Sequence, residues 1–272
     1  MSVRGVTAVA RVECAKLSAQ VKTRVALAAC AVGPFLFATA IRVQSSVPED
    51  TLFGRAVKES GFAVSLVVLG FAALWVLPVL TSIVGGDVFS AEDRHGTWKT
   101  VLTRSCRRSE VFAGKVAAAL GFSSIAMAVL AVSSVAAGLL VIGSGPLVSL
   151  SGALLPPSRA LTRVTLAWIS VLPPMFGMTA VAVLLSVATR NSAAGIGLPV
   201  VAALAMQLGA LIDGPEILHR LLVTSAFGAW HGLLAEPPYE GPLLYGAAVS
   251  VSYAVISLGI AYRVLQRRDV AA

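Results

Sequence analysis

The stretch FAVSLVVLGFAALWVLPVLTSIVGG, residues 62–86, has 25 residues and contains no Asp, Glu, Lys, Arg or His. A helix rises about 1.5 Å per residue, so roughly 20 residues cross the ~30 Å hydrocarbon layer of a bilayer. Five similar apolar stretches lie along the chain, at residues 25–41, 116–142, 164–189, 194–212 and 243–262. The sequence therefore predicts an all-α, polytopic membrane protein with six transmembrane helices.

The composition supports a membrane protein with a single domain. Of the 272 residues, 57% are hydrophobic and 12% are charged, whereas about a quarter of the residues in soluble domains are charged. The connections between the apolar stretches are short, which leaves no room for an appended catalytic domain. We expect residues 1–272 to form one transmembrane domain.

The basic residues alternate between the two sides of the predicted bundle. Fifteen of the 21 Lys and Arg residues lie in segments 1–24, 87–115, 190–193 and 263–272, and the other six lie in 42–61, 143–163 and 213–242. The positive-inside rule then places both termini and the 87–115 loop in the cytoplasm of a multi-pass cell-membrane protein. The net charge of +8 is explained by topology and anionic lipid headgroups rather than by nucleic-acid binding.

Residues 1–24 are predicted to form an amphipathic cytoplasmic interface helix. Apolar side chains recur there at steps of three or four, with basic residues around them, which is typical of a helix lying in a membrane surface. These apolar residues are Val3, Val6, Ala10, Cys14, Leu17 and Val21. The alternative is a signal sequence that is cleaved after Ala38-Thr39-Ala40, but the patterned basic region in front of the apolar run favours a retained first span.

Prolines occur inside several predicted spans, at Pro34, Pro78, Pro173-Pro174 and Pro199. Each removes a backbone hydrogen bond and can kink its helix, although prolines are also generally frequent in membrane helices. Before the sixth span, the outer connection 213–242 contains two short apolar clusters. We expect them to form a hydrophobic re-entrant or interfacial helical pair, with Trp230, Tyr239 and Tyr245 in the aromatic belt.

Residues 92–115 are the most highly charged stretch, and they connect the second and third spans on the cytoplasmic side. Ser90 followed by Asp93 is a weak capping-box pattern for a short helix. Gly96 permits a sharp turn, and Thr97 can cap a second helix that runs to Leu102. A basic cluster follows, consisting of Arg104, Arg107, Arg108 and Lys115. The loop is either a topology signal or a compact helical knob on which a cytoplasmic protein can act.

This loop resembles the one that follows the second span in type-2 ABC transporter permeases, also called ABC-2 permeases. The resemblance rests on the order Glu92, Gly96-Thr97, Val101-Leu102, Arg104, Arg108 and Lys115. It extends over the whole chain through the entry helix, the six spans and the apolar outer segment. The chain departs from the family pattern at Ser105, where Pro is usual, and at Trp98, where Leu is more common.

The resemblance implies the membrane-spanning permease subunit of an ABC exporter. The 87–115 loop would be a coupling helix that docks on a separate ATPase subunit, and the permease would pair with a second permease subunit as a homodimer or heterodimer. ATP and Mg would bind to the partner ATPase, and this chain would hold no cofactor. Spans one, two and five line the dimer interface in relatives, so Pro34, Pro78 and Pro199 are candidate flex points by resemblance. The apolar spans favour a drug-like or lipid-like substrate.

The sequence gives little evidence for a catalytic site or a metal site. The chain has no phosphate-binding loop of the Gly-x-x-x-x-Gly-Lys-Ser/Thr type, and Cys14, Cys30 and Cys106 fit no metal-binding spacing. Glu216 and His219 could form a two-ligand metal pair, with His231 and Glu236 in the same segment, but a third ligand is not evident. The remaining alternatives are a membrane-embedded enzyme of lipid metabolism and a non-transporting scaffold or immunity protein.

The charge distribution generates a test of topology. In a cysteine-free background, Glu236→Cys is expected to react with a membrane-impermeant thiol reagent added from outside the cell, because 213–242 lies outside. A cysteine at Ser18 is expected to react only after the membrane is opened. Reaction of the Glu236→Cys variant from the cytoplasmic side alone would reverse the predicted orientation.

Overall fold

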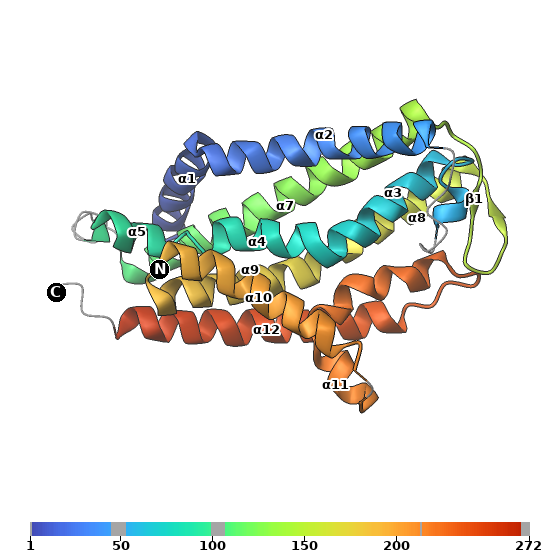
Figure 1. Cartoon of the computed structure of the whole chain (residues 1–272). Helices are drawn as coiled ribbons and strands as arrows, with labels where there is room; N and C mark the ends of the chain where they lie inside the picture. The colour runs from blue at the N-terminus through green and yellow to red at the C-terminus, as the bar shows by residue number, and fades with distance from the viewer. Residues whose placement is uncertain (1, 45–52, 99–106, 213, 268–272) are drawn as a thin grey trace.

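The computed structural model describes residues 2–44, 53–98, 107–212 and 214–267, and they form a helical bundle (Figure 1). The first half contains α1 (Val3–Ala19), α2 (Val21–Val43), the 3-10 turn η1 (Gly54–Ala56), α3 (Gly61–Phe71), the π-helical turn η2 (Ala72–Val76), α4 (Leu77–Gly85) and α5 (Ser90–His95). The second half contains α7 (Arg108–Val141), β1 (Leu147–Val148), β2 (Leu154–Leu155), α8 (Pro157–Ser170), α9 (Leu172–Thr189), α10 (Ser192–Gly209), α11 (Glu216–Leu221), the 3-10 helix η3 (Ser225–Leu234) and α12 (Gly241–Gln266).

Six helical stretches of the described residues are long and apolar enough to cross a membrane, which confirms the all-α polytopic fold. They are Val21–Val43, Gly61–Gly85, Arg108–Val141, Pro157–Thr189, Ser192–Gly209 and Gly241–Gln266. The third span begins at Arg108 and the fourth at Pro157, both earlier than predicted, because polar residues at these ends are helical too. The outer connection 143–163 also contains a small antiparallel hairpin, β1–β2, which was not predicted.

Two of the six spans are interrupted near their prolines. In the second span, α3 passes through the π turn η2 into α4, and Pro78 lies in the first turn of α4. The fourth span breaks at Val171, and Pro173 and Pro174 follow in the first turn of α9. The N–H groups in the first turn of a helix have no partner within that helix, so proline is tolerated there although it lacks an N–H. These prolines therefore lie where a new helical segment starts. By contrast, Pro34 and Pro199 lie inside α2 and α10.

Buried hydroxyl groups join the helices across the bundle. Ser65 on α3 and Ser134 on α7 are 2.8 Å apart at their Oγ atoms, and Trp168 Nε1 of α8 donates to Ser65 Oγ at 3.0 Å. Ser123 on α7 and Thr179 on α9 are 3.0 Å apart at their hydroxyl oxygens. Hydrogen bonds of this kind hold membrane helices together where the hydrophobic effect between them is weak.

The entry helix and the outer segment are helical, as predicted, but their packing differs in detail. On α1 the buried residues are Glu13 and Leu17, whereas Cys14 of the predicted apolar stripe is exposed. The outer segment forms α11 and η3, and its re-entrant character remains a prediction. Trp230 was expected in the lipid-facing aromatic belt, and this is wrong because the residue is only 2% exposed and stacks on Phe53 and His231.

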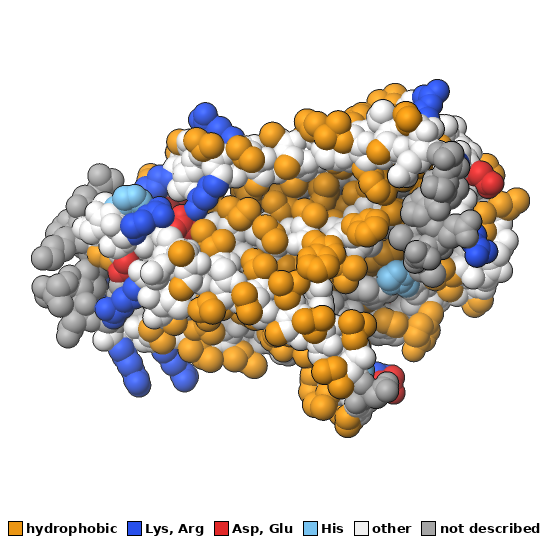
Figure 2. Space-filling model, in the orientation of Figure 1, with side chains coloured by type: hydrophobic (Ala, Val, Ile, Leu, Met, Phe, Trp, Pro, Cys, Tyr) orange, Lys and Arg blue, Asp and Glu red, His pale blue; other side chains and the backbone are white. Residues whose placement is uncertain are grey.

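The start of α1 and the end of α12 lie at the same end of the bundle (Figure 1). Figure 2 shows Lys and Arg side chains gathered at that end, whereas the length of the bundle is mainly hydrophobic on the face in view. The alternation of basic segments in the sequence thus corresponds to a basic end of the folded molecule. We call it the basic end below.

Close glycine contact between α10 and the segment after α4 provides a stability test. A Cβ atom on Gly195 would lie 2.2 Å from the Gly86 carbonyl oxygen, whereas one on Gly197 would have no atom within 4 Å. Alanine is better than glycine in a helix by about 1 kcal/mol. Gly197→Ala is therefore expected to raise the thermal unfolding midpoint of the purified protein, and Gly195→Ala is expected to lower it. Equal midpoints for the two variants would contradict this helix contact.

Candidate functional site

The described part of the 87–115 loop begins with α5, whose two ends are fixed by different residues. At its start, the Ser186 hydroxyl of α9 accepts hydrogen bonds from the backbone N–H groups of Phe89 and Ser90, at 3.2 and 3.0 Å. The predicted capping box is wrong, because the Ser90 hydroxyl instead donates to the Gly86 carbonyl at 2.9 Å. At its end, Gly96 adopts φ 62° and ψ 23°, the left-handed conformation that glycine accepts without strain.

Lys115 lies in the second turn of α7 and is 1% exposed. Its Nζ atom lies 3.1 Å from Glu13 Oε1, 2.9 Å from Glu92 Oε1 and 3.0 Å from the Val88 carbonyl oxygen. A lysine ammonium has three N–H donors, so these partners satisfy all of them. Such complete pairing is needed because a buried charge without partners is strongly unfavourable.

A second lysine completes the cluster. Lys16 Nζ on α1 lies 2.9 Å from Glu13 Oε1 and 2.9 Å from Glu92 Oε1. Glu13, Lys16, Glu92 and Lys115 therefore alternate in charge around two shared carboxylate oxygens, and we call this group the charge clamp. It joins α1, α5 and α7 with no net charge.

The environment of Glu92 keeps its carboxylate ionised. Burial alone would raise the pKa of Glu92, but the charge of Lys115 and hydrogen bonds from Thr97, Lys115 and Lys16 lower it from 4.5 to about 2. The Thr97 hydroxyl donates to Glu92 Oε2, so both carboxylate oxygens have partners. Thr97 thus stabilises Glu92, and the helix predicted to run from it to Leu102 falls outside the described residues.

A second ion pair lies beside the clamp. Lys22 of α2 is bonded to Asp87, and Arg94 of α5 lies 4.0 Å from the other Asp87 oxygen. Burial would raise the pKa of Asp87, but hydrogen bonds from Lys22 and Ser192 and the two nearby positive charges lower it. A cavity of about 660 Å³ opens between α1, α4, α5 and α7 next to these groups.

Aromatic contacts connect the loop to the last span, α12. Trp98 stacks on Phe89 at 6.3 Å between ring centroids, Phe89 contacts Phe112 at 5.5 Å, and Phe112 contacts Tyr262 of α12 at 5.2 Å. On the opposite side, α1 approaches α7 so closely that a Cβ atom on Gly114 would lie 2.6 Å from the Val9 Cβ. The loop is therefore anchored to several helices at its base.

A family model described as ABC-2 family transporter protein matches residues 10–206, which is well over half of the 272 residues. The chain belongs to the ABC-2 transporter family. No curated protein matches it. The matched region includes all four residues of the charge clamp, and the family is the membrane component of transport systems rather than a catalytic one.

The structure brings together some residues of the predicted ABC-2 coupling loop and separates others. Glu92 and Lys115 meet in the clamp, Thr97 donates to Glu92, and Gly96 ends the helix beside them. Arg108 lies at the start of α7, where its Nη1 donates to the Gln266 carbonyl at 3.1 Å. Leu102 and Arg104 fall outside the described residues, as does Cys106. Pro34, Pro78 and Pro199 lie in α2, α4 and α10.

Sequence reasoning missed Glu13 and Lys16 as site residues. The available signal was an acidic residue within an otherwise basic entry helix, with a lysine three positions later. Its partners on α5 and α7 are far away in the sequence, so spacing alone could not identify the cluster.

The polar residues of the outer segment do not assemble a metal centre. Glu216 pairs with Arg220 Nε at 3.1 Å, His219 Nε2 lies 3.0 Å from the Ile212 carbonyl, and His231 Nδ1 donates to Gly228 at 2.6 Å. Within the described ranges, no group of three or more His, Cys, Asp or Glu residues is placed to hold a metal ion.

The clamp predicts how the stability of this ABC-2 protein depends on pH. A carboxyl group whose pKa is lower in the folded than in the unfolded chain stabilises the fold above its unfolded value, and this stability is lost as the pH falls toward the folded value. Glu92→Gln is expected to lower the unfolding midpoint at pH 7, and the difference from the unmodified protein is expected to shrink between pH 4.5 and about 2. Thermal unfolding in detergent across this range measures it.

A variant of Lys115, the partner of Glu92, tests the same interaction, and a variant of Arg11 serves as the control. Lys115→Met should destabilise the protein by about 3 kcal/mol, because it leaves buried carboxylates short of a cation, and the double variant should lose less than the sum of the single losses. Arg11→Met removes an exposed charge of α1 and should change stability by less than about 0.5 kcal/mol. Additive losses for Glu92→Gln and Lys115→Met would refute the clamp.

Proposed function

We propose that this chain is the membrane-spanning permease subunit of an ABC exporter. It moves a hydrophobic or amphipathic substrate, drug-like or lipid-like, out of the cytoplasm or the inner leaflet. A separate ATPase subunit supplies the energy and binds ATP and Mg. The permease works as a dimer with a second copy or a related chain.

The observation that carries this proposal is the difference between the two ends of α5. Arg94, His95 and Gly96 are exposed at its tip, whereas Glu92 near its base is 5% exposed and bound within the charge clamp. A protein that docks on the exposed tip therefore pushes on an element that is firmly tied to the bundle. This is the arrangement that mechanical coupling requires.

The contacts of α5 determine which helices would move when a protein docks on its tip. Glu92 connects to α1 and α7 through Lys16 and Lys115, and Ser186 connects the start of α5 to α9. The helix is also joined directly to α4 by residues 86–89. Closure of an ATPase dimer would thus move α1, α4, α7 and α9 together, and the cavity beside the clamp gives them room.

The basic end supports a cytoplasmic orientation for both termini. Anionic lipids of the inner leaflet and the positive-inside rule favour Lys and Arg on that side. The same end carries α5, so the exposed tip faces the compartment where ATP is available. These features support a multi-pass protein of the cell membrane whose docking surface faces the cytoplasm.

The face built by α2, α3–η2–α4 and α10 suits a substrate path and a dimer contact. These are spans one, two and five, and an apolar groove of about 690 Å³ runs between α2 and the second span. Pro34 lines this groove, while Pro78 and Pro199 lie in the neighbouring helices, so all three remain candidate flex points. Large apolar side chains stay exposed on the face, including Leu36, Trp75 and Val201.

Coupling is tested with variants of the loop in a reconstituted complex with a partner ABC ATPase. Gly96→Val should impair transport and permease-stimulated ATP hydrolysis, because a β-branched residue at φ 62° costs about 1 kcal/mol or more. Arg104→Glu and Arg108→Glu should weaken ATPase binding about tenfold, because charge complementarity sets register and partner choice.

Matched variants separate docking from folding. Asn tolerates the left-handed conformation, so Gly96→Asn should keep coupling where Gly96→Val loses it. Arg11→Glu reverses a charge at the same end but outside the loop and should leave ATPase binding intact. Membrane abundance, ATPase pull-down and efflux are measured on every variant. Full coupling in both Gly96→Val and Arg104→Glu would mean that the loop only directs topology.

A further inference from the structure

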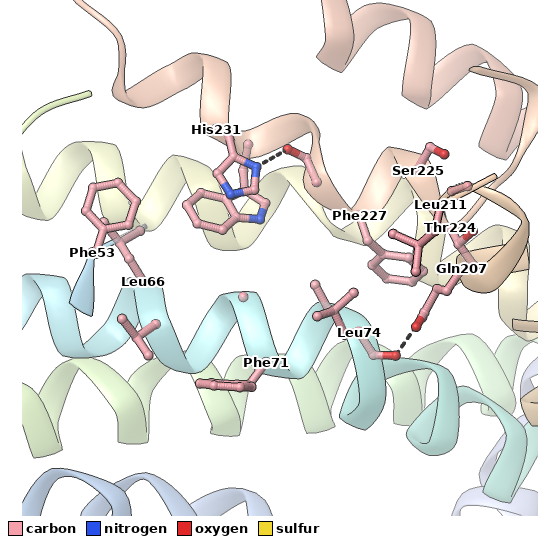
Figure 3. Close-up of a pocket in the computed structure, with 16 residues that line it drawn as sticks. Phe53, Leu66, Phe71, Leu74, Gln207, Leu211, Thr224, Ser225, Phe227 and His231 are labelled. Atoms are coloured by element: carbon pink, nitrogen blue, oxygen red, sulfur yellow. Dashed lines mark hydrogen bonds between the residues drawn. The ribbon is translucent and has the colours of Figure 1, made fainter. Parts of the chain in front are cut away.

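A second cavity, of about 440 Å³, lies toward the other end of the bundle from the charge clamp, and we call it the outer cavity (Figure 3). Its walls come from α3 and η2 on one side and from α10 and η3 on the other. Most of the lining is apolar or aromatic, including Leu66, Phe71, Leu74 and Phe227. None of the described residues that line it is Asp, Glu, Lys or Arg.

Two polar groups of the lining have no partner among the described residues. Thr224 is 8% exposed and Trp230 is 2% exposed, yet the Thr224 hydroxyl and the Trp230 Nε1–H make no hydrogen bond. A buried polar group without a partner typically costs about 1–3 kcal/mol. By contrast, the serine and tryptophan groups between α3, α7 and α8 are all paired.

The cavity has a polar group toward each end. Figure 3 places Thr224 beside Gln207 and Leu211, and places His231 and Phe53 toward the opposite end, with Phe71 and Leu74 on the helix across from His231. The His231 Nδ1–H donates to the Gly228 carbonyl, and burial lowers the pKa of His231 although this hydrogen bond partly offsets the effect. The imidazole is therefore neutral at pH 7 and adds no charge to the lining.

The walls are held in place without the help of a ligand. Pro78 has no N–H to donate to the Leu74 carbonyl four residues earlier, and Gln207 Nε2 of α10 donates to this carbonyl at 2.6 Å. Trp230 is fixed between His231, at 3.8 Å between ring centroids, and Phe53, at 6.2 Å. π turns occur often at functional sites, and a preformed apolar cavity with a few fixed polar groups is the usual form of a small-molecule site.

We propose that the outer cavity binds an uncharged amphiphile whose aromatic or aliphatic body fills the apolar middle and whose carbonyl or hydroxyl oxygen accepts a hydrogen bond from the Thr224 hydroxyl. Thr224, Phe227, Trp230 and His231 lie beyond residue 206, where the family match ends. The inference rests on the proposed function in one respect only, that the bound ligand is a transported substrate. Binding itself needs no ATPase.

Benzophenone serves as the probe, because it is a neutral ketone with two rings and inserts into nearby C–H bonds on illumination. The purified full chain in lipid nanodiscs is illuminated over a range of benzophenone concentrations, and labelled residues are found by mass spectrometry. Saturable labelling is expected in 66–74 and 224–231. Diphenylmethane has the same rings without the carbonyl, and it should compete at least several-fold more weakly than unlabelled benzophenone added in the dark.

Thr224→Val removes the hydroxyl while keeping the shape of the side chain. It should raise the half-saturating concentration about five- to tenfold, since one hydrogen bond is worth about that factor, and Thr224→Ser should restore it. Because the hydroxyl has no partner in the free protein, Thr224→Val should not lower the unfolding midpoint. Gly228→Leu, whose Cβ would have only His231 atoms within 4 Å, at 3.7 and 3.9 Å, should fill the cavity and abolish saturable labelling.

Thr179→Val is the matched control, because the Thr179 hydroxyl is bonded to Ser123 and Met175. It should lower the unfolding midpoint and leave labelling unchanged. The proposal fails if labelling is spread over all spans without saturation, or if Thr224→Val leaves half-saturation unaltered. It also fails if Thr224→Val destabilises the protein as much as Thr179→Val does, since the hydroxyl would then already have a partner. Efflux failure with intact labelling would instead count against the exporter.

Discussion

The ammonium group of Lys115 is the charge around which the basic end of the molecule is organised. With 1% of the residue exposed, it cannot be solvated by water, and its hydrogen bonds must come from the protein. Glu13 and Glu92 supply two of them, which brings α1 and α5 onto α7. Lys16 then balances the second negative charge. The positions of the entry helix and of the loop thus follow from the need to satisfy one buried lysine.

The spans could be predicted from the sequence because the constraint that produces them is local. Hydrocarbon requires about 20 apolar residues in a row, and that length is read directly from stretches such as 62–86. The left-handed Gly96 was predictable for the same reason, since its conformation depends mostly on the residue type. The family pattern of the loop also identified Glu92 and Lys115 as important.

The remaining features depend on contacts between residues far apart in the chain. Glu13 meets Lys115, and Ser186 rather than Ser90 caps α5, and neither pairing leaves a trace in local spacing. Trp230 was assigned to the lipid interface because its type and position in an outer connection favour that location. Its burial against Phe53 depends on how η3 packs on the bundle, which apolar clusters in a sequence do not specify.

Charge and apolar surface are separated along the bundle, and one span connects the two regions. The charges gather at the basic end, where water and headgroups limit the penalty of ionisation, while the outer cavity and the groove beside α2 lie among apolar side chains. The second span reaches both, because Val84 of α4 lines the cavity beside the clamp and Leu74 of η2 lines the outer cavity. Between these positions the helix contains a π turn and Pro78, the places where its hydrogen-bond ladder is weakest. A displacement of α5 would therefore reach the outer cavity through a span that is itself able to bend.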